Sequence, residues 1–392
     1  MFNGDKLQEL RLLYGMSRAE LAEKLNITEQ AIWQFETNKV KPKVSPTILS
    51  LAKEFKVDIR FFEGETLDSY VNRGSIAFRN EDLASKKTIQ MQEVYVNAVH
   101  ALIQKLENYL SSPSKIIYSL IQEIDDLLLK KQMSDAVIAE ISLLARERLG
   151  VSIHNDDLLY KLEMSGINVM SRFMPVGSSA DAYSLWTKDN VPYLVLAIGK
   201  SYARRNFDLA HELGHLLLHR AVDFEFLDNA EHERREQEAN LFASNFLLPD
   251  KEFKKTFELM VGGKVSQPDR YIGLKQYFNV SIQALEYKAY RLGYLTPAQN
   301  SYFYRQIHKK GYKNSEPLDS DTPVFKPGKI LSMVDVVLSN NLTDVQSLLY
   351  SLRISKEMLA EILNVDVSFF DKYKNSINDY SNIIKLVDKK EA

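Results

Sequence analysis

The pentapeptide His211-Glu-Leu-Gly-His215 is the feature that most restricts what this chain can fold into. It lies in a run from Asp208 to His219 whose apolar residues predict one buried helix. Residues four apart on an α-helix lie about 40° from each other around the axis, so both imidazoles project from one face. Two imidazoles placed in this way can hold a zinc ion, and Glu212 between them is placed to deprotonate a water molecule. From these five residues alone, the alternative is a core helix with two hydrogen-bonded histidines.

A second predicted helix supplies a third ligand. Residues 231–249 have apolar positions at helical spacing and end at Pro249. Glu236 and Asn240 are four apart and share a face, so one turn offers a carboxylate and the next an amide that can orient a ligating histidine. Glu238 is the competing carboxylate, but it projects about 200° away from Glu236. We therefore predict His211, His215 and Glu236 as the metal ligands, with Asn240 beside one of the histidines.

These residues resemble the gluzincin arrangement, in which HExxH is followed by a helix carrying Glu-x-x-x-Asp/Asn. From about residue 77 to 294 the chain more closely resembles the ImmA/IrrE family of bacterial metallopeptidases. The stretches that carry the resemblance are Arg205–His219, Glu236-x-x-Ala-Asn-x-Phe-Ala243 and Leu247-Leu-Pro249. The resemblance implies a zinc metallopeptidase that cleaves a repressor-like or antitoxin-like protein.

Composition limits the other classes of protein. The chain has 392 residues, of which 45% are hydrophobic, so we expect two or three domains with real cores. It has no cysteine, which excludes disulfides and cysteine-based zinc sites. The sequence shows no apolar run long enough to cross a bilayer and no signal-peptide pattern at its start, so we expect a cytoplasmic protein that does not associate with membranes. The net charge of −2 predicts that any contact with DNA is local.

The first 63 residues predict such a contact. Ser17 can cap a helix over 18–25 with Glu20 at the capping-box position, and Thr28 can cap the next helix, over 29–36. This spacing is typical of a helix-turn-helix, and the segment resembles the Cro/cI-type (XRE) DNA-binding domain. In that geometry the residues that face the major groove are Glu29, Gln30, Trp33 and Gln34. The predicted phosphate contacts are Lys39, Lys41 and Lys43.

Charge gives this interpretation little support. Residues 1–60 hold ten Lys/Arg and eight Asp/Glu, a net of only +2. The alternative is a small helical domain that binds protein. A long amphipathic helix predicted over 88–110 could form a homodimer interface, or it could simply pack within the chain.

Between residues 166 and 197 apolar and polar residues alternate, as is typical of β-strands. Three alternating segments, 166–171, 182–186 and 192–197, predict a small antiparallel sheet against the metal-binding helices. An edge strand can hold a substrate by strand addition, and we predict residues 193–198 for that edge. A tetrahedral oxyanion needs a donor besides the metal, and the sequence does not choose among His219, His232, Tyr183 and Tyr202. A histidine at a helix end, such as His219, more commonly forms a hydrogen bond to a backbone carbonyl than takes part in a reaction.

The C-terminal third repeats the pattern of the N-terminal module. Residues 355–373 align without a gap on residues 17–35, with identical residues at Ser355 and Asn364. We predict a helix-turn-helix-like module over about 330–390, after a proline-containing linker at 314–328. Asp366 and Asp371 lie where base-reading residues would be, so protein binding or dimerisation is favoured over DNA reading. Chance similarity of short amphipathic helices is the alternative.

The predicted fold class is α+β and mostly helical: an all-α helix-turn-helix domain, a zincin-like metallopeptidase domain with a small sheet, and a C-terminal helical domain. The predicted segments are 1–65, a helical linker at 66–132, 133–313 and 314–392. The predicted function is a regulatory zinc endopeptidase, with manganese as an alternative metal, in which Glu212 is the general base. The alternatives are a transcription regulator that uses the fold without catalysis, and the antitoxin of a toxin–antitoxin pair. For a peptidase of this kind we expect latency or a required partner.

Overall fold

The computed structural model describes residues 2–42, 44–63, 70–71, 77–78, 86–110, 115–172 and 182–376. The chain divides into two compact units. The first unit contains Met1–Val71, Ser85–Ser112 and Ile330–Ala392, and the second contains Asn72–Ala84 and Pro113–Lys329. The division into four predicted segments stays a prediction, because compactness does not show which stretches fold independently.

The first unit begins with a helix-turn-helix whose helices start and end at the predicted caps. Its helices are α1 (Gly4–Leu13), α2 (Arg18–Leu25), α3 (Glu29–Glu36) and α4 (Leu49–Glu54), with a π-helical turn η1 (Val44–Ile48) and a 3-10 helix η2 (Ile59–Glu63). Ser17 and Glu20 form the capping box of α2, and Thr28 accepts the N–H of Ala31 at the start of α3. Asn26 turns the chain between α2 and α3 in the left-handed conformation, with φ 53°.

A buried ion cluster fixes the end of α3 against α1 and α2. Glu36 is 2% exposed and receives hydrogen bonds from Arg11 Nε at 2.5 Å and from Arg18 Nε at 2.6 Å. Both oxygens of the carboxylate are therefore used, which is the condition under which a buried charge is tolerated. The cluster holds α3 at a defined angle to the rest of the module.

The same unit contains a long helix and the C-terminal module. Helix α5 (Lys86–Glu107) buries an apolar face that packs against α1 and α17, so it packs within the chain. The C-terminal module comprises α15 (Lys329–Ser339), α16 (Val345–Leu352), α17 (Lys356–Leu363) and a 3-10 helix, η7 (Val367–Ser376). The predicted third α-helix of this module is therefore a 3-10 helix, and the rest of the predicted module, 377–390, lies outside the described residues.

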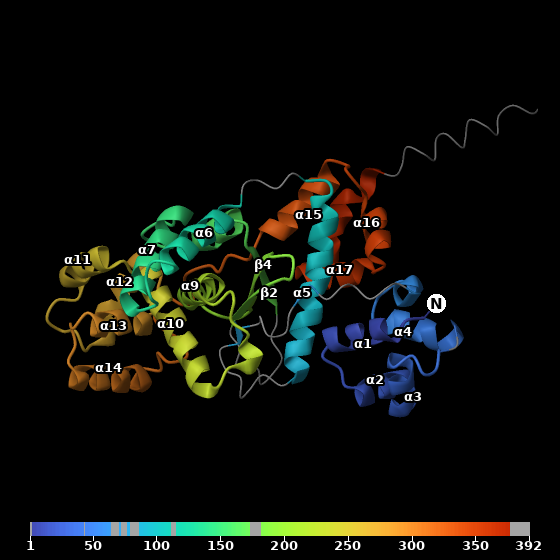
Figure 1. Cartoon of the computed structure of the whole chain (residues 1–392), viewed down its shortest axis with the longest axis horizontal. Coiled ribbons are helices and arrows are strands. Elements are labelled where there is room, and N and C mark those ends of the chain that lie inside the picture. The colour runs from blue at the N-terminus through green and yellow to red at the C-terminus, as the bar shows by residue number, and fades with distance from the viewer. Residues whose placement is uncertain are drawn as a thin grey trace, which may run out of the picture. The chain divides into compact units, whose positions relative to one another are not determined.

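The second unit is a helical layer around a small sheet. Its helices are α6 (Ile116–Leu128), α7 (Asp135–Leu149), α8 (Leu158–Met164), α9 (Tyr202–Leu218), α10 (Asn229–Leu247), α11 (Asp250–Met260), α12 (Ile272–Phe278), α13 (Ile282–Arg291) and α14 (Pro297–Lys309), with short 3-10 turns η5 (Phe224–Phe226) and η6 (Pro268–Tyr271). Helices α9 and α10 pack on each other, and α9 also packs on the strands β3 and β4 of the sheet (Figure 1). They are the two helices predicted to carry the metal ligands.

The sheet has four strands in the order β1-β3-β4-β2. They are β1 (Ala77–Phe78), β2 (Asn168–Arg172), β3 (Ala182–Trp186) and β4 (Pro192–Ala197). The pair β3–β4 is antiparallel as predicted, and β1, which was not predicted, also pairs antiparallel with β3. Strands β2 and β4 are parallel, contrary to the prediction, so the sheet is mixed. The prediction that residues 193–198 form an edge is wrong, because β4 has a strand on each side.

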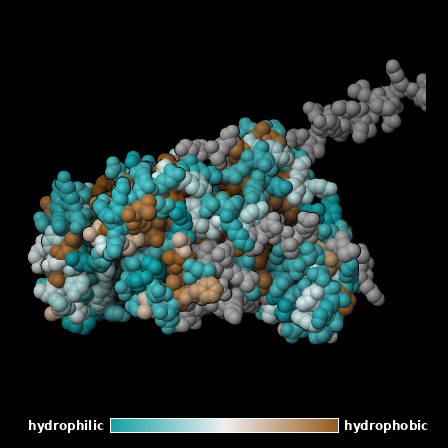
Figure 2. Space-filling view, viewed as in Figure 1, coloured by the Kyte–Doolittle hydropathy of each residue, from teal (hydrophilic) through white to brown (hydrophobic). Residues whose placement is uncertain are grey.

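The fold class is α+β and mostly helical, as predicted. In the described residues no helix combines the length and apolar character needed to cross a membrane. Hydrophilic side chains cover much of the face seen in Figure 2, with separate apolar patches between them.

Candidate metal centre and nucleic-acid interface

Helix α9 presents the two histidines of the HExxH pentapeptide from its buried face. His211, Glu212 and His215 are 3%, 3% and 4% exposed. The Nε2 atoms of the two histidines lie 3.1 Å apart, as expected for residues one helical turn apart whose rings converge. Two polar rings buried this deeply need partners, and α10 supplies them.

Glu236 of α10 completes a three-residue cluster. Its Oε2 lies 3.4 Å from His211 Nε2, and its Oε1 lies 3.1 Å from His215 Nε2. Among the described residues these three side chains form a group able to hold a metal ion, with ligand atoms within 4.8 Å of one another. Zinc bonds of about 2.0–2.1 Å at tetrahedral angles would place ligand atoms roughly 3.3 Å apart. The 3.1 Å between the two Nε2 atoms, and the 3.4 Å and 3.1 Å from each of them to its nearer Glu236 oxygen, are close to that value.

Neighbouring side chains determine which nitrogen of each imidazole carries the proton. The Nδ1 of His211 lies 3.1 Å from Asn240 Oδ1, an acceptor, so Nδ1 is the protonated nitrogen and Nε2 keeps its lone pair. His219 Nε2 donates to Glu238 Oε2 at 2.9 Å, which leaves His219 Nδ1 to accept the Nδ1–H of His215 at 3.0 Å. The Nε2 of His215 therefore also keeps its lone pair.

The protonation states agree with this assignment. Burial lowers the pKa of His219 to about 4, so its ring is neutral at pH 7 and can accept one hydrogen bond while it donates another. Two imidazole lone pairs and a carboxylate thus converge on one point, a donor set that suits a divalent cation and especially zinc.

Glu212 is hydrogen-bonded to the sheet. Its Oε2 accepts a hydrogen bond of 2.7 Å from Ser184 Oγ, in the middle of β3. A buried carboxylate held at one oxygen has a defined orientation, which is what a general base requires. Sequence reasoning missed Ser184. Its only signal is that it is the one serine in the otherwise apolar and aromatic segment Ala-Tyr-Ser-Leu-Trp.

The glycine of the pentapeptide allows the two helices to approach. A Cβ at Gly214 would lie 3.1 Å from Cδ1 of Phe242 and 3.3 Å from Cα of Ala239, both on α10. Such contacts are tighter than most Cβ atoms make, so a larger residue would push α10 away. The short separation of the helices is what brings Glu236 within reach of the histidines.

Other predictions for this region have mixed outcomes. Glu238 lies beside His219 and Arg235, away from the three-residue cluster. The expectation that His219 bonds to a backbone carbonyl is wrong, because its ring joins His215 to Glu238. Tyr202 Oη donates to the carbonyl of Asp156 at 3.0 Å, so it is committed elsewhere.

The predicted DNA-contacting residues lie along one helix and the loop after it. On α3, Glu29 and Gln30 are exposed, while Trp33 and Gln34 are half-buried. Lys39 Nζ lies 4.0 Å from the centre of the Trp33 ring, so the cation and the ring meet on one surface. Lys41 is exposed, and Lys43 lies outside the described residues. This surface combines amide groups that can read bases with cations that can contact phosphates.

The C-terminal module lacks that surface. Asp371 pairs with Lys356 at 2.9 Å, and Lys372 pairs with Asp335 at 2.6 Å, so charges at the positions that would read bases are used inside the module. Asp366 precedes η7 and accepts the N–H of Ser368. The prediction that this module favours protein binding or dimerisation over DNA reading stays a prediction.

Two stretches of the chain match models of known protein families. Residues 163–290 match the family model of the IrrE N-terminal-like domain, and residues 7–62 match the helix-turn-helix model. The first stretch includes the three-residue cluster and Glu212, and the second includes α2 and α3. No curated protein matches the chain. The chain therefore joins an N-terminal helix-turn-helix domain to a metallopeptidase-like domain that matches the IrrE N-terminal-like family model.

Proposed function

We propose that this protein is a DNA-binding regulatory zinc metallo-endopeptidase that cleaves a repressor-like or antitoxin-like protein. The observation that carries the proposal is the convergence of His211 Nε2, His215 Nε2 and a Glu236 carboxylate oxygen, with both tautomers fixed from outside. Three ligands are the usual number in a catalytic zinc site, whereas structural zinc takes four. Within the described residues the cluster offers three.

Each residue of the site would have its own role in peptide hydrolysis. His211, His215 and Glu236 would hold zinc, which when bound acidifies water and polarises a peptide carbonyl. Glu212 would accept a proton from the attacking water and deliver it to the nitrogen of the leaving amine. Ser184 would hold the Glu212 carboxylate in orientation through its 2.7 Å hydrogen bond. Asn240 and His219 would keep the two ligating imidazoles in the required tautomer.

The helix-turn-helix domain would bring this activity to DNA. Gln30 and Gln34 suit adenine edges in the major groove, and Lys39, Lys41 and Lys43 suit phosphates. A peptidase bound at an operator would meet a repressor there at high local concentration. This arrangement explains why one chain carries both domains.

Comparison of the wild type with Glu212→Gln tests the proposal. Glutamine keeps the shape of the side chain and removes its basicity, so the variant should retain its metal. New protein N-termini would be labelled in cells that produce either form. We expect at least one protein cleaved only with the wild type. Identical sets of N-termini, with zinc bound in both forms, would overturn the peptidase assignment and support the alternative of a non-catalytic regulator.

A further inference from the structure

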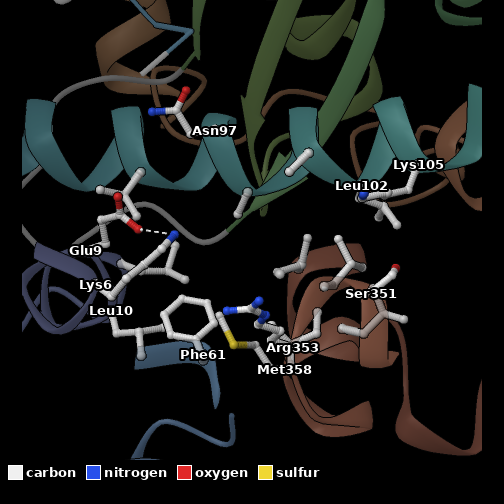
Figure 3. Close-up of a pocket in the computed structure, with 18 of the residues that line it drawn as sticks. Lys6, Glu9, Leu10, Phe61, Asn97, Leu102, Lys105, Ser351, Arg353 and Met358 are labelled. Carbon is white, nitrogen blue, oxygen red and sulfur yellow. Dashed lines mark hydrogen bonds and ion pairs between the residues drawn. The ribbon is translucent and has the colours of Figure 1, made fainter. Parts of the chain in front are cut away.

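The first unit contains a cavity between its helix-turn-helix and its C-terminal module. Val57 and Ile354 form an antiparallel bridge that joins the two modules directly. Helix α5 closes another side, where Tyr95 Oη donates to the carbonyl of Ile362 at 3.2 Å. Figure 3 shows the cavity below α5, and its volume is about 580 Å³. Sites for small organic molecules commonly have volumes of about 300–1,000 Å³.

The walls of the cavity are mainly apolar. Leu10 of α1, Phe61 of η2 and Met358 of α17 line it from three elements. Helix α5 contributes Ala98 and Ala101, two small side chains on the face toward the cavity. Longer side chains at these two positions would fill the space, so the cavity depends on them.

The charged groups at the cavity are unbalanced in favour of cations. Lys6 and Glu9 pair with each other at 3.0 Å, which neutralises one end (Figure 3). The other charged side chains that line the cavity are Lys105, Arg353 and Glu63. Within the described part of the chain, neither Lys105 nor Arg353 forms an ion pair with a carboxylate, although Arg353 donates to the carbonyl of Arg60 at 3.0 Å and its charge helps to lower the pKa of Asp58. Two cations therefore face one acid beside an apolar wall.

We propose that this cavity binds a small amphipathic organic anion. Its apolar body would lie between α5 and Phe61, and its anionic group would lie near Lys105 and Arg353. Because both modules contribute walls, the bound ligand would stabilise the contact between them. The inference is independent of the metal centre.

A pair of dyes that differ in charge tests the proposal on the full chain. 8-Anilino-1-naphthalenesulfonate is an apolar anion, and N-phenyl-1-naphthylamine has the same body without the sulfonate. We expect the anion to bind the native protein at one site and the neutral dye to bind more weakly. Ala101→Trp should abolish binding of both dyes, because the indole fills the cavity.

Variants that remove charge separate this site from general dye binding. Lys105→Gln should weaken the anion about tenfold and leave the neutral dye unchanged, as expected for loss of one charge-assisted contact. Lys53→Gln, an exposed lysine of α4 away from the cavity, is the matched control. The proposal would be overturned if the native protein binds neither dye, if Ala101→Trp folds and still binds, or if both lysine variants bind the anion alike.

A separate observation concerns the edge of the sheet in the second unit. Strand β1 pairs antiparallel with β3, with Ala77 opposite Ser184 and Phe78 opposite Tyr183. Ser184 is also the residue that hydrogen-bonds to Glu212. The strand therefore lies on β3 at the position nearest the proposed general base, on the side that β4 leaves open.

We infer that β1 occupies the edge to which a substrate would add, and that it must leave before a substrate binds. Enzymes and receptors commonly bind extended peptides as an added strand, and an antiparallel edge beside the general base offers such a place. Here the chain itself supplies the added strand. This inference rests on the proposed peptidase function, and it supplies the latency that the sequence led us to expect.

The double variant Ala77→Pro/Phe78→Pro tests this inference, because proline removes the backbone N–H groups that pair with β3. We expect faster amide hydrogen exchange in β3 and at least tenfold faster digestion of labelled casein, both measured on the full chain loaded with zinc. Adding Glu212→Gln should abolish the digestion and leave the faster exchange.

The outcomes distinguish this inference from the proposed function. If the wild type and the proline variant digest casein at equal rates, β1 does not restrict access and the peptidase stands. If exchange in β3 is unchanged, β1 does not cover the edge. If exchange rises and zinc is bound but nothing is digested, the peptidase proposal fails, and the inferred role of β1 with it.

Discussion

The two functional regions of this protein hold their residues in opposite ways. On α3, Glu29 and Gln30 are exposed, and no buried network holds them. On α9, His211 and His215 are buried, and each ring is held by a further side chain, Asn240 for one and His219 for the other. A DNA-reading surface can be altered one residue at a time, whereas the metal centre depends on the packing of two helices. The comparison predicts which substitutions change stability and which change only binding.

The largest effect is expected where α9 and α10 are closest. Gly214→Val would force its side chain against Phe242 and Ala239, and we expect a loss of about 3 kcal/mol in the free energy of unfolding. Urea denaturation measures it. Gln30→Ala on the exposed face of α3 is the control and should change stability by less than about 0.5 kcal/mol. If Gly214→Val and Gln30→Ala change the free energy of unfolding equally, the contrast between the packed metal centre and the exposed face of α3 is wrong.

The two units also differ in how they hold a buried carboxylate, Glu36 in the first and Glu286 in the second. Glu36 is paired with two arginines, but Glu286 of the second unit is fully buried and forms no ion pair with any described residue; its carboxyl interacts with the hydroxyl of Tyr304. Burial raises the pKa of Glu286 to about 7, above its ordinary value. The neutral form therefore stabilises the fold below the unfolded pKa of 4.5, and this stability is lost as the pH rises through 7.

We expect Glu286→Gln to be more stable than the wild type at pH 8 by about 2 kcal/mol and to match it at pH 4. Urea denaturation at the two pH values measures the difference. If the wild type and Glu286→Gln differ in free energy of unfolding by the same amount at pH 4 and at pH 8, Glu286 does not titrate in this range.

The side chains that hold the imidazoles should matter for the metal and little for folding. Asn240→Ala removes the acceptor for His211 Nδ1–H, and we expect zinc affinity to fall about tenfold. Competition with a chelator measures it. Gln237→Ala, an exposed position on α10, is the matched control and should leave the affinity unchanged.

The smallest effect is expected on the exposed surface. Gln34→Ala should weaken binding to a selected DNA site about fivefold, near the lower limit for loss of one base contact, and should change neither zinc content nor stability. Fluorescence anisotropy measures the affinity. Lys372→Ala, the corresponding position of the C-terminal module, should leave DNA binding unchanged. A similar loss with Lys372→Ala would mean that the C-terminal module also reads DNA.

Local patterns allowed much of this structure to be predicted from the sequence. The caps Ser17 and Thr28 start α2 and α3 where expected, and Asn26 and Asn364 both turn the chain with φ 53°. The proximity of Glu236 to His211 and His215 followed from helical periodicity alone. Caps and periodicity depend on neighbours within a few residues, which a sequence displays directly.

The features that were missed depend on residues far apart in the chain. The hydrogen bond between Ser184 and Glu212, the bond between His219 and Glu238, and the parallel pairing of β2 with β4 all join separate elements. By contrast, the 3-10 conformation of η7, the third element of the C-terminal module, has a local cause. Val-Ser-Phe-Phe replaces the helix-favouring Glu-Gln-Ala-Ile of α3, and Asp366 bonds two residues ahead, which favours a tighter turn.

Metal content of isosteric variants tests the central claim most directly. The full chain, with Glu236→Gln and Glu238→Gln on the same helix, would be loaded with zinc and analysed by mass spectrometry. We predict about one zinc per chain in the wild type and in Glu238→Gln, and none in Glu236→Gln. A Glu236→Gln variant that keeps its zinc, or a wild type that takes up neither zinc nor manganese, would contradict the three-ligand site and the function proposed from it.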